Sequence, residues 1–284
     1  MANPYQKYPV RINSVYNETE DKRLKTFGLS FVNSEDSDYF FSQSFQPGQY
    51  ALVWIPGYGE IPLGIASAPT EHNKLVFTVN KTGKVTSKLH TLTEGMLIGL
   101  RGPLGNGYPW EKLKGKNIFL IGGGCAFSTL RSSIKYLLSP ENRQDYNDIW
   151  IVHGARTPGM LLYKDNFKEW RKRDDVKVHI TVDSTSLATG EYHVGNVPFV
   201  LKQELPTVDE NSVAIVCGPP MMIKYSIDPL KEKGFLPENV LFSLENKMKC
   251  GIGHCGRCSI GKTCICTEGP VFSMAEVNEM PDDY

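Results

Sequence analysis

This sequence contains no long apolar run, no excess of charge of either sign and no internal repeat. Because no window approaches about 18 consecutive apolar residues, a membrane-spanning helix is not expected. The 31 basic and 31 acidic residues balance, which argues against a surface for nucleic acid or for an anionic membrane. The first residues do not combine a charged start with an apolar stretch, so we expect no signal peptide and a cytoplasmic location.

The length of 284 residues favours two domains, or three if one is a small module held by a metal. The first part of the chain contains short segments in which apolar and polar residues alternate, separated by turns rich in proline and glycine. We expect strands over residues 8–16, 23–32, 51–55 and 75–80. Many short strands of this kind favour a small antiparallel β-barrel or sandwich, and we assign residues 1–111 to a β-barrel.

From residue 112 onward, apolar strands alternate with helices. We expect strands over 117–121, 148–153, 176–182 and 212–217, and helices over 128–138, 163–172, 199–204 and 219–233. Apolar runs interleaved with helices predict a parallel sheet covered on both faces, so residues 112–239 form an expected α/β domain. A last strand over 240–244 leads into a third region, residues 240–284.

The third region contains five of the seven cysteines, at positions Cys250, Cys255, Cys258, Cys264 and Cys266. The first three have the C-x4-C-x2-C spacing of loops that bind a [2Fe–2S] cluster. The interspersed Gly251, Gly253 and Gly256 allow positive φ angles and close approach of amide groups to sulfur. A structural zinc knuckle usually has two short-spaced pairs further apart, and disulfides are not expected without export. We therefore predict a [2Fe–2S] module, with the fourth ligand open between Cys264 and Cys266.

Two turns rich in glycine or proline follow strands of the expected parallel sheet. One contains Gly122, Gly123 and Gly124 and precedes a helix, although it does not match G-x-G-x-x-G. The other is Cys-Gly-Pro-Pro-Met at 217–221. Because ligands of open α/β sheets bind at the carboxyl ends of the strands, both turns are candidates for holding a nucleotide. Taken alone, Cys217 is either a small buried residue or a neighbour of a nicotinamide.

These motifs together resemble the ferredoxin–NADP reductase superfamily, whose members join a flavin-binding β-barrel to a nicotinamide-binding α/β domain. Cys-Gly-Pro-Pro-Met is among the more specific marks of that superfamily, and the segments 122–132 and 153–156 are similar to its nucleotide-binding strand ends. The resemblance implies that Cys217 has a catalytic position beside the nicotinamide. It implies nucleotide contacts from Gly122, Gly123, Gly124, Arg156, Cys217, Gly218, Pro219, Pro220 and Met221.

For the flavin, the segment 83–89 resembles the part of the family that holds the pyrophosphate. The usual Arg-x-Tyr-Ser motif is absent, because the aligned residues 61–67 read Ile-Pro-Leu-Gly-Ile-Ala-Ser. The resemblance implies FAD as the cofactor, with FMN left open. It implies flavin contacts from Pro62, Leu63, Gly64, Ala66, Ser67, Gly83, Val85, Thr86 and Ser87.

The cysteine loop narrows the resemblance to one branch of the superfamily. This branch contains the electron-transfer subunit of dihydroorotate dehydrogenase, the gamma subunits of NAD(P)-linked cytoplasmic hydrogenases (sulfhydrogenases) and the corresponding chain of anaerobic sulfite reductase. The segments 248–258, 269–272 and 280–284 look most like the last two. Their fourth ligand precedes a Gly-Pro-Val-Phe turn, so the implied ligands are Cys250, Cys255, Cys258 and Cys266.

The resemblance implies an electron-transfer, diaphorase-type subunit. A nicotinamide transfers a hydride, a [2Fe–2S] cluster takes single electrons, and a flavin can do both. We therefore expect electrons to pass between NAD(P)H, the flavin, the cluster and a partner such as a hydrogenase, a sulfite reductase or a ferredoxin. The alternatives are an electron-transfer subunit of dihydroorotate dehydrogenase and a non-enzymatic docking subunit with a zinc-filled cysteine loop. NADH versus NADPH stays open.

Overall fold

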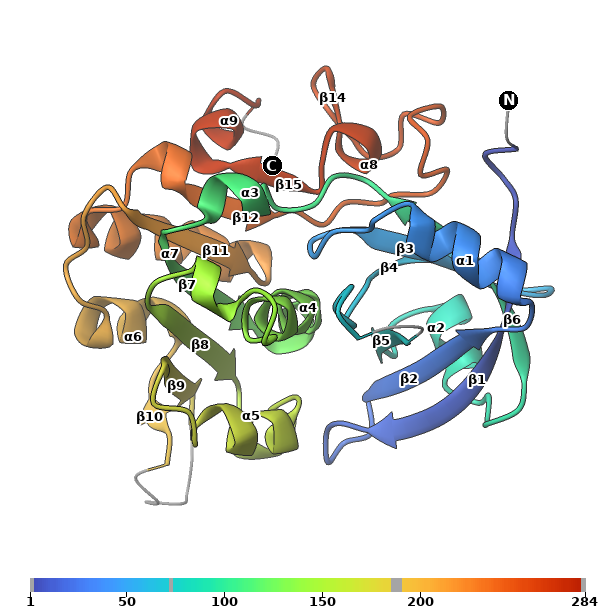
Figure 1. Ribbon diagram of the computed structural model, residues 1–284, viewed down its shortest axis with the longest axis horizontal. Coiled ribbons are helices and arrows are strands. Elements are labelled where there is room, and N and C mark those ends of the chain that lie inside the picture. Colours follow the sequence, from blue (N-terminus) through green and yellow to red (C-terminus); the bar gives the residue numbers. More distant parts are fainter. Residues whose placement is uncertain (1–2, 72–73, 185–190, 282–284) are drawn as a thin grey trace.

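The computed structural model describes residues 3–71, 74–184 and 191–281. Figure 1 shows two lobes side by side, with the C-terminal segment running across one end of both. The antiparallel lobe, the parallel α/β lobe and the cysteine-rich segment confirm the expected fold class. Within the described residues, no helix combines the length and the hydropathy that crossing a bilayer requires.

The first lobe is a six-stranded antiparallel sheet with the strand order β4-β3-β6-β1-β2-β5. Its strands are β1 (Tyr8–Asn17), β2 (Leu24–Phe31), β3 (Tyr50–Ile55), β4 (Gly59–Gly64), β5 (Leu75–Asn80) and β6 (Leu97–Leu104). Buried aromatic and β-branched side chains fill its interior, among them Phe27, Phe40 and Phe77. The short helices α1 (Ser34–Ser42) and α2 (Lys84–Leu89) cover the sheet and, like β4 and β6, were not expected from the sequence.

The second lobe is a seven-stranded sheet with the order β10-β9-β8-β7-β11-β12-β15. Its strands are β7 (Asn117–Gly123), β8 (Ile149–Ala155), β9 (Val176–Val182), β10 (His193–Val194), β11 (Ser212–Cys217), β12 (Val240–Ser243) and β15 (Val271–Ser273). The strands are parallel except for β15, which pairs antiparallel with β12. Separate apolar cores lie on the two faces of this sheet. Its main helices are α4 (Phe127–Leu137), α5 (Lys164–Trp170), α6 (Val197–Glu204) and α7 (Pro220–Lys233).

The cysteine-rich segment is a loop between β12 and β15. It contains a small hairpin, β13 (Ser259–Ile260) and β14 (Thr263–Cys264), and the single-turn helix α8 (Ile265–Glu268). Gly251, Gly253 and Gly256 have φ angles of 70°, 76° and 66°, as expected from their positions. Since β12 is hydrogen-bonded to β11, the large sheet continues across the proposed boundary at residue 239, and the division into three domains stays a proposal.

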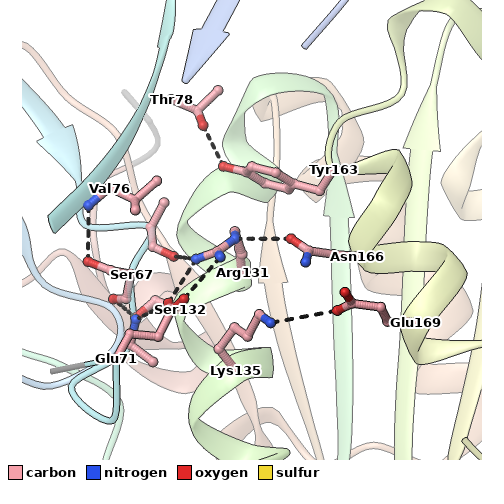
Figure 2. Close-up of polar contacts among 12 residues, drawn as sticks. Ser67, Glu71, Val76, Thr78, Arg131, Ser132, Lys135, Tyr163, Asn166 and Glu169 are labelled. Carbon is pink, nitrogen blue, oxygen red and sulfur yellow. Dashed lines mark hydrogen bonds and ion pairs between the residues drawn. The ribbon is translucent and has the colours of Figure 1, made fainter. Parts of the chain in front are cut away.

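An ion pair between α4 and the first lobe joins the two lobes. The Arg131 guanidinium donates to the Ala66 carbonyl at 2.7 Å and to the Glu71 carboxylate at 2.9 Å. The neighbouring Ser132 hydroxyl donates to the Ser67 carbonyl at 2.7 Å. Figure 2 shows these contacts between α4 and the loop that precedes β5. The sequence placed Arg131 in a nucleotide-binding segment, whereas in the structure its side chain holds the lobes together.

Candidate functional site

Two adjoining cavities lie along the carboxyl edge of the parallel sheet and between the lobes. The first has a volume of about 540 Å³, and the second has a volume of about 390 Å³. Asn80 at the end of β5 and Cys125 at the start of the segment leading into α4 line both cavities. Ligands in the two cavities would therefore be in contact, or nearly so, across these two side chains.

The first cavity contains five residues that the sequence assigned to a nucleotide. They are Gly123, Gly124, Arg156, Pro219 and Met221. Gly124 has a φ of 57°, which a residue without Cβ adopts without strain and which exposes its backbone to the cavity. Such a cradle, at the carboxyl ends of β7, β8 and β11, fits a dinucleotide.

Four other predicted nucleotide residues are not part of the cavity wall, namely Gly122, Cys217, Gly218 and Pro220. Gly122 instead allows α4 to pack closely on β7, since an added Cβ would lie 2.5 Å from the Phe127 ring. This is the packing role of a glycine in nucleotide-binding turns.

The barrel contributes residues to the first cavity that sequence reasoning missed. Asp21 and Arg23 come from the turn between β1 and β2 and line the cavity together with Arg156 and Asp183 of the α/β lobe. Hydrogen bonds from the Thr19 hydroxyl and the Arg23 amide lower the pKa of Asp21. No local pattern in a short acidic turn indicates that the other lobe will dock against it.

The second cavity contains four of the residues that were assigned to a flavin. Pro62, Leu63 and Gly64 on β4 form one wall, together with Thr86 of α2. An added Cβ at Gly64 would collide with Thr129 of α4, so the close approach of the two lobes here requires glycine. The Thr86 hydroxyl accepts a hydrogen bond from the Gly83 amide at 2.8 Å, which fixes the start of α2 at the cavity.

Five predicted flavin residues are not in this wall. They are Ala66, Ser67, Gly83, Val85 and Ser87. Ala66 and Ser67 are fully buried, and their carbonyl groups accept the hydrogen bonds from α4 described above. Ala66 and Ser67 therefore do not line the cavity, but they hold α4 in place next to it.

Tyr50 provides an aromatic ring at the second cavity that was not identified from the sequence. The side chain is 3% exposed, and its hydroxyl donates to the Cys266 carbonyl at 3.1 Å. Burial, reinforced by the thiols of Cys266 and Cys258, raises the pKa of Tyr50, so the phenol stays protonated and keeps this donor. Tyr50 thus connects the cavity directly to the cysteine loop.

Glu245 also lines the second cavity. It lies two residues after the end of β12. Desolvation by the surrounding protein raises the pKa of its carboxyl group, although part of the side chain remains exposed. A residue at this point was not recognised from the sequence, because a single glutamate between a strand and a lysine-rich loop has no distinctive pattern.

Cys217 lies behind the wall of the second cavity. Its thiol is 1% exposed and accepts a hydrogen bond from the Thr129 hydroxyl at 3.1 Å. Burial raises the pKa of the Cys217 thiol to about 12, so it is uncharged at neutral pH. The catalytic position implied by the resemblance stays a prediction, and any influence of Cys217 on a ligand would act through Thr129.

The cysteine loop brings three thiols together. The Cys264 sulfur lies 4.0 Å from that of Cys258 and 3.9 Å from that of Cys266. Cys264 is therefore placed as well as Cys266 to act as a ligand, and the choice of Cys266 stays a prediction. Cys258 and Cys266 are buried, whereas Cys255 is exposed, so one edge of the loop reaches the surface.

Backbone amide groups in the loop point at sulfur atoms. The Gly253 amide donates to the Cys266 sulfur at 3.3 Å, and the Cys255 amide donates to the Cys250 sulfur at 3.4 Å. Although partial burial acts in the opposite direction, amides of Ile252, Cys255 and His254 lower the pKa of the Cys250 thiol to about 6. Thiolates stabilised by amides are the donor set that an iron–sulfur cluster requires, so the loop fits a [2Fe–2S] group.

Comparison with protein families gives two matches. Residues 120–227 match the oxidoreductase NAD-binding domain. Residues 245–278 match the iron–sulfur cluster binding domain of dihydroorotate dehydrogenase B. Together they confirm the expected order of a nucleotide-binding domain followed by a cluster-binding segment.

Among curated proteins, the chain is similar to the sulfhydrogenase 2 subunit gamma of Pyrococcus furiosus. The two are 34% identical, and the alignment covers 95% of this chain and 96% of the relative. It is also 32% identical to the probable electron-transfer subunit of dihydroorotate dehydrogenase B (NAD(+)) of Methanocaldococcus jannaschii, with 86% of this chain and 82% of the relative aligned.

Among solved structures, an NADH-dependent reduced ferredoxin–NADP oxidoreductase superposes with a TM-score of 0.74. The sequences are 25% identical, and the match covers 100% of this chain and 92% of the other. A ferredoxin NADP+ reductase from Neisseria gonorrhoeae with bound FAD and NADP shares the fold, with a TM-score of 0.68, 20% identity and coverage of 83% of this chain and 97% of its own.

Proposed function

Because the chain belongs to the family of electron-transfer subunits that includes the sulfhydrogenase gamma subunits and the electron-transfer subunits of dihydroorotate dehydrogenase B, we propose that it is a diaphorase-type oxidoreductase subunit. It moves electrons between NAD(P)H, a flavin and a [2Fe–2S] cluster, to or from a partner chain. The partner is a catalytic subunit such as a hydrogenase, by analogy with the names of these relatives.

One observation carries this proposal: the two cavities and the cysteine loop are contiguous. Asn80 and Cys125 form a wall common to both cavities. Tyr50 lies in the second cavity and hydrogen-bonds to Cys266. A nucleotide, a flavin and a cluster held at these places would lie in the order that electron transfer requires, with the flavin in the middle.

The residues of the chain bind and orient these groups. Gly123, Gly124 and Arg156 would hold the dinucleotide in the first cavity, with Pro219 and Met221 closing its other side. Pro62, Leu63, Gly64 and Thr86 would hold the flavin, and the ring of Tyr50 would exclude water between the flavin and the cysteine loop. When bound, FAD exchanges a hydride with the nicotinamide and single electrons with the cluster.

The proposed cluster ligands are Cys250, Cys255, Cys258 and Cys266. The amides of Gly253 and Cys255 stabilise the thiolate charge. Since Cys255 is exposed, this edge is where we place the contact with the partner. A reducing, cytoplasmic compartment fits a chain with several closely spaced free thiols.

The first experiment is anaerobic purification, followed by flavin, iron, sulfide and zinc analysis and by visible spectra with NADH and with NADPH. We expect about one flavin and about two irons per chain, with both chromophores bleached by the preferred nucleotide. The variant Cys258→Ser should lose iron and keep flavin bleaching. Zinc without flavin would contradict the proposal and support a docking subunit instead.

A further inference from the structure

A cluster of metal-ligating side chains lies at the opposite edge of the large sheet from the cysteine loop. It consists of His179 on β9, His193 on β10 and Glu204 at the end of α6. One ligand atom from each residue lies within 4.8 Å of the others. The three residues come from three different elements, so the fold and not a local motif brings them together (Figure 1 shows these elements).

The spacing of the two imidazoles matches that of ligands on one metal ion. His179 Nδ1 lies 3.3 Å from His193 Nε2. Two nitrogens bound to tetrahedral zinc at about 2.0–2.1 Å would be about 3.3 Å apart. The other ring nitrogen of His193, Nδ1, lies 3.3 Å from Glu204 Oε1. A carboxylate on the far nitrogen of a ligating histidine is the usual arrangement that fixes its tautomer and orientation.

The surrounding structure holds both rings in place. The His179 ring stacks on Trp150 with a centroid distance of 5.4 Å and an interplanar angle of 5°. The short β10 pairs in parallel with β9, with His193 opposite Thr181. The Thr181 hydroxyl lies within hydrogen-bonding distance of the backbone carbonyls of His193 and Gly195, which fixes the chain on both sides of β10. The nearby Lys177 ammonium lies 4.4 Å from the centre of the Trp150 ring and 3.5 Å from the Asp148 carboxylate.

We propose that His179 and His193 bind a divalent transition-metal ion of the zinc class, with Glu204 as the positioning residue that orients His193. Water completes the coordination. Such an ion would clamp the edge strand β10 to β9. The segment that follows β10 contains Asn196, which caps α6 and lines the first cavity. The metal site would therefore stabilise one wall of that cavity.

The test uses the cluster-loaded protein, so that the cysteines are occupied. Zinc uptake is measured by equilibrium dialysis, and the zinc ligands are identified by X-ray absorption. We expect one bound zinc with nitrogen and oxygen neighbours, and its loss in the double variant His179→Gln/His193→Gln. Glu204→Gln should weaken zinc binding by about 10–100-fold. The matched control Glu232→Gln, which removes an exposed carboxylate paired with Lys202 at 2.9 Å, should bind zinc like the wild type.

Two results would overturn the proposal. Sulfur neighbours in the absorption spectrum would place the zinc on cysteine. Equal zinc uptake by the wild type and the double variant would mean that the two histidines and Glu204 form only a hydrogen-bonded chain. If the double variant does not fold, the comparison of Glu204→Gln with Glu232→Gln still tests the proposal. Equal zinc affinity in these two variants also overturns it.

Discussion

Replacing Arg131 by methionine tests how much the ion pair between the lobes stabilises the protein. Arg131 is almost fully buried and donates to Glu71, Ala66 and Asn166, and the Glu71 side chain is 19% exposed. Arg131→Met would leave the Glu71 carboxylate largely buried without its partner. Breaking such a pair costs about 3–5 kcal/mol, and the remaining exposure of Glu71 favours the lower end, about 3 kcal/mol.

The effect should depend on pH in a defined direction. Burial acts to raise the pKa of Glu71. The hydrogen bonds and the charge of Arg131, together with the hydrogen bond from the Ala68 amide, act more strongly in the other direction, so the pKa of Glu71 is lowered. A lowered carboxyl pKa contributes stability above the pKa of the unfolded chain, and this contribution is lost as the pH falls through the folded value. The stability difference between wild type and Arg131→Met should therefore shrink in acid.

The assay is urea denaturation, followed by tryptophan fluorescence and by flavin release, in a double-mutant cycle with Glu71→Gln. The matched control is Lys135→Met on the same helix, since Lys135 is 3.8 Å from Glu169, whose side chain is 65% exposed (Figure 2). That pair should contribute less than about 1 kcal/mol. A coupling between Arg131 and Glu71 below about 0.5 kcal/mol, or a difference that does not change with pH, would refute the reasoning.

Three further predictions concern the cavities and the cysteine loop. Cys266→Ser should lower the iron content and change the electron paramagnetic resonance spectrum of the reduced cluster. Cys264→Ser should have the iron content and the spectrum of the wild type. The reverse result would make Cys264 the ligand. Gly64→Ala should reduce flavin content several-fold because its Cβ meets Thr129, and the added substitution Thr129→Ser should restore part of it. Residues 246–267 contain no acidic residue, and the lysines and the arginine in this range are exposed. The rate at which the protein reduces an acidic ferredoxin should therefore fall with added salt and in the variant Lys262→Glu. An unchanged rate would argue against docking of the ferredoxin at this face.

Several elements could be predicted from the sequence because local chemistry determines them. The strands over Leu75–Asn80, Val176–Val182 and Ser212–Cys217 have the expected bounds. Each is rich in valine and other apolar residues and lies between turn-forming residues, although Val176–Val182 alternates apolar with polar residues. The glycines of the cysteine loop take positive φ where close packing against sulfur was expected. The cysteine spacing indicated a cluster-binding segment, and the matching family covers the same part of the chain.

The walls of the two cavities could not be predicted in the same way. Asp21, Arg23 and Asn80 reach the first cavity only because the lobes dock, and Arg131 contacts Glu71 across the two lobes. Residues so far apart in sequence leave no periodic pattern. The same reason explains why Tyr50 was not identified. In the sequence it is an ordinary strand residue, and only the structure shows that its hydroxyl contacts Cys266.

The cysteine loop starts from β12 and returns to the sheet at β15, and these two strands are hydrogen-bonded neighbours. The chain therefore leaves and re-enters the sheet at nearly the same point. Insertions at such a point leave the strand order unchanged and are well tolerated. In evolution, the cluster-binding segment, which would carry single electrons, can therefore be gained, lost or exchanged as a unit at this point, while the lobes that form the two cavities keep their topology.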